Sequence, residues 1–298
     1  MRGGVVKDDP QFAGQNAELT QRVRHGDRDR FLTGLFAPPE KRQALFAIYA
    51  LEFELARIPE LVSEPMLGEI RLQWWRELID AVTTGHGRQM HPLSAPLIHA
   101  IEGQLVPRAG FDRLIDSFSD SISAAADGEA ALTPYPGLAA SLDLAAALLA
   151  DDQITGEEGG AGIAALSEGY QLVLQILSLS DHASGGQHPR IALSWLAGHG
   201  LRRAGLRADE NREAVRQMTK AMADRACDRL RYAAGDRMLA RPEMRPLGWL
   251  IVLCAGYLNL LRRGKFDPFA KSMQVPVYRR QFWLMRAMLR RGGLSRGL

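Results

Sequence analysis

Cysteine is scarce in this chain of 298 residues, which has only Cys227 and Cys254. Both lie in apolar helical patterns and form no Cys-x-x-Cys pair, so the sequence predicts neither a disulfide framework nor a zinc site. The N-terminus lacks an apolar segment of signal-peptide length. The longest uncharged run, residues 246–261, is shorter than the ~20 residues that cross a bilayer. We therefore expect a soluble protein of a reducing compartment, the cytoplasm.

Strand-like alternation of apolar and polar residues is also missing, and no internal repeat period occurs. The net charge of +3 is too small to indicate a nucleic-acid partner, and none is predicted. Hydrophobic residues make up 46% of the chain, enough for a sizeable core. We expect an all-α protein of about ten helices, with an N-terminal segment and short helix at residues 1–24 and a single helical domain at residues 25–298.

The centre of the sequence pattern is the helix predicted to follow Lys41. Its apolar residues go nearly all the way round, which is typical of a helix buried in the middle of a helical protein; they are Ala44, Leu45, Phe46, Ile48, Tyr49, Leu51, Phe53 and Leu55. Two carboxylates, Glu52 and Glu54, lie in that apolar setting. Pro59 is expected to end the helix, because the residue before a proline is pushed out of helical geometry.

Residues 49–60 resemble the first aspartate-rich helix of the squalene/phytoene synthase family, in which a Tyr-Ala-Phe stretch precedes Asp-Asp-x-x-Asp. Tyr49 and Ala50 match that pattern. Only one acid remains at the family's three aspartate positions, which here hold Ala56, Arg57 and Glu60. The resemblance extends over about residues 25–270 and implies the isoprenoid-synthase fold, a helical bundle around a central cavity.

The missing aspartates matter because active members of the family use Mg²⁺ to bridge carboxylates to the diphosphate of the substrate. An Asp-x-x-x-Asp spacing places two carboxylates on one helix face, where they can share the ion. Ala56 and Glu60 occupy those two places here, and Arg57 cannot ligate Mg²⁺. We therefore predict no catalytic residues, no metal site and no cofactor, with Mg²⁺ required only if the chain is an enzyme.

A second helix, predicted over residues 163–180, tests the resemblance again. Active members carry Gln-Leu-x-Asn-x-x-Arg-Asp-x-x-x-Asp at this place. Gln171 matches, whereas the other polar positions have been replaced by Leu174, Leu177, Ser178 and His182. From the surviving positions we predict three candidate substrate-binding residues, Tyr49, Glu60 and Gln171.

The glycine-rich segment before that helix, residues 156–162, is not predicted to cradle a phosphate. It has neither a preceding strand nor the Gly-Lys-Ser ending of a phosphate-binding loop. We expect a plain loop that leads into the helix.

Residues 52–56, Ser63-Glu64 and Gln73-Trp74-Trp75 are similar to a side branch of the same family, the mitochondrial complex I assembly factor and its bacterial relatives. That branch is regarded as non-catalytic. The resemblance thus implies a protein partner, such as an assembly intermediate of respiratory complex I.

The helix predicted over residues 67–82 contains both members of the tryptophan pair. Its apolar period predicts a core face made of Leu67, Ile70, Trp74, Leu78 and Val82. One ring of Trp74 and Trp75 is expected in the core, and the other becomes an interface anchor if it is exposed, as tryptophan often is. The sequence leaves open which ring that is.

Residues 278–291 predict a basic amphipathic helix, with interface candidates Arg279, Arg280 and Trp283. Such a helix can lie on an anionic membrane surface, which would make the protein peripheral on the inner membrane. The alternative is a last bundle helix with a solvated arginine face.

Three functions remain open from the sequence. The first is a non-catalytic family member that acts through a protein or a membrane surface. The second is a prenyl diphosphate condensing enzyme in which Glu52, Glu54 and Glu60 supply carboxylates. The third is a lipid carrier that uses the former substrate cavity.

Overall fold

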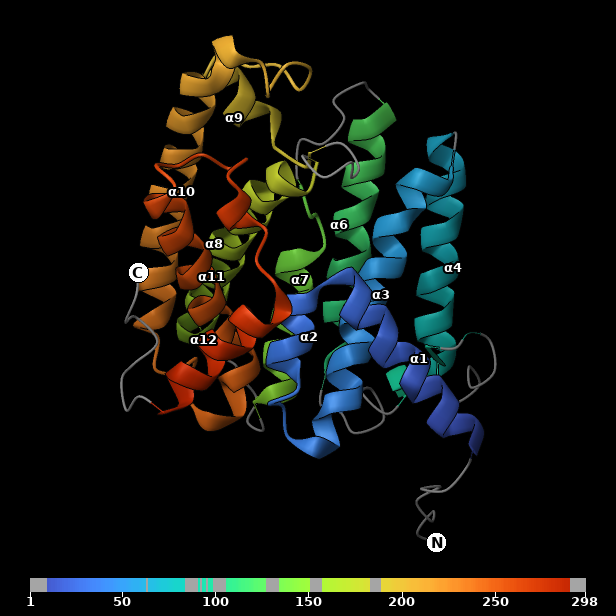
Figure 1. The fold of residues 1–298 in the computed structure, drawn as a ribbon. Coiled ribbons are helices and arrows are strands. Elements are labelled where there is room, and N and C mark those ends of the chain that lie inside the picture. Colours follow the sequence, from blue (N-terminus) through green and yellow to red (C-terminus); the bar gives the residue numbers. More distant parts are fainter. Residues whose placement is uncertain are drawn as a thin grey trace, which may run out of the picture.

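The computed structural model describes residues 10–62, 64–83, 91, 93, 94, 96–98, 106–126, 134–150, 157–182 and 189–289, and every regular element in them is a helix (Figure 1). The all-α prediction is confirmed. The division at residue 24 stays a prediction, although Leu19 and Val23 of the first helix are buried in the same core as the rest of the bundle.

The α-helices are α1 (Pro10–Gly26), α2 (Arg28–Gly34), α3 (Pro39–Leu61), α4 (Pro65–Thr83), α6 (Arg108–Ala126), α7 (Leu138–Leu149), α8 (Glu157–His182), α9 (Leu193–Gly198), α10 (Arg212–Ala234), α11 (Arg245–Arg263) and α12 (Val277–Leu289). Three 3-10 turns, η1 (Asp209–Asn211), η2 (Pro242–Met244) and η3 (Lys271–Met273), join the later ones.

The helices form two groups with α2 and α7 between them. Figure 1 places α8, α10 and α11 on one side and α3, α4 and α6 on the other. Helix α7 contacts α3, α6 and α8, while α2 contacts α3 and α11. The two central helices therefore connect both groups and bring residues that are far apart in the sequence to one place.

Helix α3 is buried as its sequence predicts. Leu45, Ile48, Tyr49 and Leu51 are all inaccessible to solvent. The predicted stop at Pro59 is wrong, because α3 continues to Leu61. A proline removes only one backbone donor, and this close to the end of a helix the loss does not prevent a further half turn.

The predicted core face of α4 is wrong by one position for its first half. Leu67 and Ile70 are exposed, and Leu72 and Trp75 are buried in their place. Gly68 is also buried, packed against α6, where a Cβ atom would come within 2.9 Å of the end of the Ile122 side chain. The inward face of α4 therefore contains Gly68, Leu72 and Trp75, and the neighbouring apolar stripe faces outward.

The glycine-rich segment is also more ordered than predicted. Helix α8 begins at Glu157, so Gly159, Gly160 and Gly162 belong to its first turns rather than to a loop. At Gly162 the helix lies directly against the Asp236 carboxylate, which leaves no room for a Cβ atom.

Two helices are long and apolar enough to cross a membrane by length and composition, residues Gly160–Ser180 of α8 and Pro242–Arg263 at α11. In each of them 67% of the most apolar window is buried inside the bundle. Both are thus core helices in the described part of the chain, and they pack against each other and against α10.

Candidate functional site

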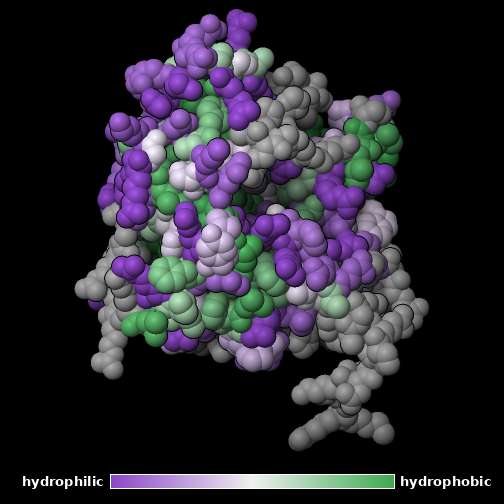
Figure 2. Space-filling model, viewed as in Figure 1, coloured by the Kyte–Doolittle hydropathy of each residue, from purple (hydrophilic) through white to green (hydrophobic). Residues whose placement is uncertain are grey.

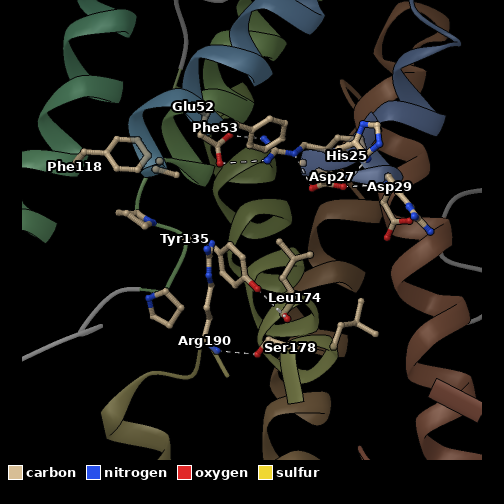
Figure 3. Close-up of a pocket in the computed structure, with 18 of the residues that line it drawn as sticks. His25, Asp27, Asp29, Glu52, Phe53, Phe118, Tyr135, Leu174, Ser178 and Arg190 are labelled. Carbon is tan, nitrogen blue, oxygen red and sulfur yellow. Dashed lines mark hydrogen bonds and ion pairs between the residues drawn. The ribbon is translucent and has the colours of Figure 1, made fainter. Parts of the chain in front are cut away.

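A cavity of about 660 Å³ opens between the two groups of helices (Figure 3). Its volume falls within the range of ordinary small-molecule sites, ~300–1,000 Å³. Residues from α2, α3, α6, α8 and α12 line it, together with the segment 134–137 before α7. Figure 3 shows charged residues of α2 and α3 along one wall and Tyr135, Leu174 and Ser178 along another.

The charged wall is organised around Arg30, whose side chain is almost fully buried. Its Nε donates to Asp27 at 2.9 Å, and its Nη1 and Nη2 both donate to the Glu52 carboxylate, Nη2 at 3.2 Å. The guanidinium also lies over the rings of Tyr49 and Phe53, 4.8 and 4.9 Å from their centroids. Burial opposes the charge of Arg30, but the neighbouring carboxylates of Glu52 and Asp27 raise its pKa above the ordinary value.

Asp27 is the N-cap of α2. One carboxylate oxygen accepts the backbone N–H groups of Asp29 and Arg30, each at 2.9 Å, which is the usual reason for an aspartate at this position. Both oxygens also accept the hydroxyl of Tyr170 from α8, at 2.8 and 2.9 Å. Arg30 is a further donor to Asp27, so most acceptor sites of this carboxylate are occupied.

Asp29 connects α2 to the last two helices. Its carboxylate accepts the hydroxyl of Tyr257 of α11, at 2.8 and 2.9 Å, and faces Nη1 of Arg280 of α12 at 3.4 Å. Burial raises the pKa of Asp29 to about 6, with Arg280 acting in the opposite direction and Asp27 adding to the rise. Burial likewise raises the pKa of Tyr257 far above its ordinary value.

This donor set does not fit Mg²⁺. Asp27 and Glu52 already hold Arg30, and Asp29 holds Tyr257 and Arg280. In the part of the chain that the structure describes, no three His, Cys, Asp or Glu side chains are grouped so that they could hold a metal ion. The carboxylates in the cavity wall therefore form ion pairs with arginines, which take up the oxygen atoms that a metal ion would need.

Four of the replaced motif positions line this same cavity. Ala56 of α3 and Leu174, Leu177 and Ser178 of α8 are all in its wall. Arg57 is exposed and lies 3.4 Å from Glu54, away from the cavity. Glu60 and His182 are helical, but their side chains lie outside the described residues.

Two predicted substrate-binding residues do not reach the cavity wall. Tyr49 is completely buried beside Arg30, and its hydroxyl has no hydrogen-bond partner among the described residues. Gln171 donates to the carbonyls of Pro134 and Tyr135, so it anchors the segment before α7. That segment contributes Tyr135, which has a φ of 58° and donates its hydroxyl to the Leu174 carbonyl at 3.3 Å.

Of the two neighbouring tryptophan rings, one lies in the core and the other faces outward. Trp75 is 6% exposed and Trp74 is 37% exposed, with ring centroids 5.1 Å apart. Trp74 thus joins an outward apolar stripe at the end of α3 and on α4, which we call the α4 stripe and which consists of Leu61, Met66, Leu67, Ile70 and Trp74. Figure 2 shows part of it at the upper right.

The three C-terminal interface candidates lie on different sides of α12. Arg280 lines the cavity, and Trp283 packs on Tyr257 with ring centroids 5.4 Å apart. Arg279 is half-buried. Two of the three therefore face the bundle, because α12 lies across α11 on that side.

The sequence did not single out Asp27, Asp29 and Arg30 as site residues. Their signal is the run Asp27-Arg28-Asp29-Arg30 directly before an apolar stretch, where four consecutive charges precede a short helix. Tyr170 and Tyr257 carried no such signal, because each looks like an ordinary core residue of an apolar helix.

The model of the squalene/phytoene synthase family matches residues 23–281. Among curated proteins, the chain is similar to NADH dehydrogenase (ubiquinone) complex I, assembly factor 6, of Bos taurus, with 27% identity over 104 residues, 35% of this chain and 31% of that protein. The Homo sapiens protein of the same name is 33% identical over 81 residues, 27% of this chain and 24% of that protein. The matched part thus spans about a third or less of these relatives.

Solved structures give the same fold. A dehydrosqualene synthase in complex with ligand superposes with a TM-score of 0.69 at 14% identity, over 94% of this chain and 97% of that one. Squalene synthase HpnC from Alicyclobacillus acidocaldarius superposes with a TM-score of 0.65 at 18% identity, over 88% of this chain and 98% of that one. At these identities the likeness concerns the fold alone.

Proposed function

The chain belongs to the squalene/phytoene synthase family, and from that premise we propose that it is a non-catalytic member, which acts through a protein partner during assembly of respiratory complex I. Its place would be the cytoplasm, at the surface of the inner membrane. The observation that carries the proposal is the pairing of Arg30 with Asp27 and Glu52 in the wall of the cavity that the altered motif positions line.

The loss of the metal site supports the absence of catalysis. Ionisation of an allylic diphosphate leaves a highly charged leaving group, which Mg²⁺ stabilises when carboxylates hold the ion. Ala56, Leu174 and Leu177 offer no ligand at the family's polar positions, and the remaining cavity acids face arginines and tyrosine hydroxyls. A single lost ligand can be compensated, but here both motifs have changed together.

The similarity to assembly factor 6 supports the kind of partner. The α4 stripe is the surface on which we expect that partner to bind, because it is apolar, outward and includes a tryptophan. Tryptophans with one face on a core and an exposed edge are frequent anchors of protein interfaces. The fixed contact of Trp74 with Trp75 and His91 also keeps its ring in one orientation.

Loss of the protein is expected to reduce assembled complex I. Deleting the gene should lower complex I activity in membranes while carotenoid and hopanoid levels stay constant. Complementation with Trp74→Ala should fail partly, since an interface tryptophan contributes ~2 kcal/mol, roughly thirtyfold in affinity. Tyr232→Ala, an exposed aromatic on α10, is the matched control and should complement fully. Unchanged complex I in the deletion strain would refute the proposal.

The purified protein is expected to be inactive on prenyl diphosphates. Incubation with farnesyl or geranylgeranyl diphosphate and Mg²⁺ should give no condensation product by mass spectrometry, because the donor set for the ion is absent. An active squalene synthase assayed in parallel shows that the assay detects product. Turnover above the no-protein background would establish the condensing-enzyme alternative.

A second candidate function, lipid binding without chemistry, is favoured by the cavity itself. About 660 Å³ remains open between walls that include Phe53, Phe118 and Leu174. A carrier should retain lipid through purification, so an organic extract of the protein would contain it in near-stoichiometric amount. An extract free of lipid would count against this function.

A further inference from the structure

Helix α12 presents an apolar face to solvent. Tyr278 is 70% exposed, Phe282 and Met285 are each 50% exposed, and Leu289 is 80% exposed. Their spacing of four, three and four residues puts them on one side of a helix. We call this the α12 face; Figure 2 shows apolar side chains gathered over α12 at the lower left.

The opposite side of α12 is firmly attached to the bundle, which fixes the direction of the α12 face. Leu284 is buried, and the Trp283 ring lies so close to Gly256 of α11 that a Cβ atom there would clash. Arg280 adds the ion pair with Asp29 at 3.4 Å. These three contacts hold the apolar side of α12 outward. Its exposure is therefore a feature of the folded protein and does not result from fraying of the helix end.

The charge around the α12 face indicates what kind of surface this face binds. Seven of the 37 Lys and Arg residues and none of the 34 Asp and Glu residues follow Asp267, so residues 1–267 contain 30 basic and 34 acidic residues. The chain up to Asp267 is therefore net negative, and the C-terminal part carries only positive charge. Within α12, Arg279 and Arg286 lie beside the apolar residues, and no acid is present.

From this we propose that α12 lies in the surface of an anionic lipid bilayer, with Tyr278, Phe282, Met285 and Leu289 inserted among the acyl chains and Arg279 and Arg286 at the headgroup phosphates. Interfacial helices combine this kind of apolar stripe with flanking cations. The proposal deepens the proposed function, since it names the surface that holds the protein at the membrane. It differs from the sequence expectation in the residues used, because Arg280 and Trp283 face the bundle.

The test is flotation of the full-length protein with vesicles. We expect it to bind vesicles of phosphatidylcholine and phosphatidylglycerol in equal parts, and to remain free with phosphatidylcholine alone. Phe282→Ser with Met285→Ser should weaken binding at least tenfold, and Arg279→Gln with Arg286→Gln should weaken it by roughly fivefold for each charge. Met66→Ser with Ile70→Ser on the α4 stripe is the matched control and should bind as the unchanged protein does.

Several outcomes would overturn the proposal. These are no binding to anionic vesicles, equal binding to neutral vesicles, or full binding by a Phe282→Ser, Met285→Ser variant with unchanged circular dichroism. Light scattering tests whether the chain forms a dimer through the α12 face instead. A dimer that the same variant abolishes would assign this face to a second copy of the chain. The vesicle assay needs no partner protein, so the two proposals can fail independently. Complex I unaffected by gene deletion would overturn the proposed function without contradicting vesicle binding.

Discussion

Replacing Arg30 with methionine is expected to destabilise the protein by ~3–5 kcal/mol, because the change leaves two buried carboxylates without their counter-ion. The side chains of Arg30, Asp27 and Glu52 are only 3%, 8% and 6% exposed, so solvent compensates the two carboxylates poorly when the guanidinium is lost. Ser141 and the π faces of Tyr49 and Phe53 would lose their contacts with the guanidinium as well.

Urea unfolding followed by circular dichroism measures this effect. Arg28→Met is the matched control, since its side chain is exposed two positions earlier on the same helix, and it should change stability by less than ~0.5 kcal/mol. Arg30→Met combined with Glu52→Gln should recover part of the loss, because the second change removes one of the stranded charges. An Arg30→Met variant as stable as the unchanged protein would show that the cavity acids do not depend on this arginine.

The contribution of Asp29 to the free energy of unfolding is expected to fall as the pH rises from about 4 to 7. Burial raises the pKa of this carboxyl from 3.8 to about 6, so the folded protein binds the proton more tightly than the unfolded chain does. The contribution of Asp29 is thus fully present below the unfolded pKa and is lost as the pH passes through the folded one. The loss amounts to about 3 kcal/mol, taking 1.36 kcal/mol for each unit.

Asp29→Asn isolates this contribution from those of other carboxylates. The free energy of unfolding of the variant, minus that of the unchanged protein, should rise by about 2.4 kcal/mol between pH 4 and pH 7, most of the full effect. Any constant offset from the weaker contact with Arg280 does not affect that slope. A flat difference for Asp29→Asn would mean that the fold does not raise the pKa of Asp29.

The parts of the molecule that follow from local periodicity could be predicted from the sequence. The all-round apolar pattern near Tyr49 identified α3 as a buried helix, whereas the helical bundle around a cavity was implied by the family resemblance rather than by periodicity. Helix positions of this kind depend on spacing along one segment, which the sequence states directly.

The ion-pair cluster could not be predicted, because its members come together only in the folded protein. Asp27 meets Tyr170 across 143 residues, and Asp29 meets Tyr257 across 228. The inner face of α4 was predicted wrongly for a related reason, since two apolar stripes look alike in the sequence and only packing against α6 shows which of them lies inward.

The last part of the sequence, after Asp267, carries seven basic residues and no acidic one. A proteolytic cut after Asp267 would leave a fragment with 30 basic and 34 acidic residues, against 37 and 34 in the chain of net charge +3. At neutral pH the fragment and the intact chain would migrate toward opposite electrodes. A negatively charged surface therefore attracts the C-terminal segment more strongly than the net negative remainder of the chain, which favours first contact through that segment.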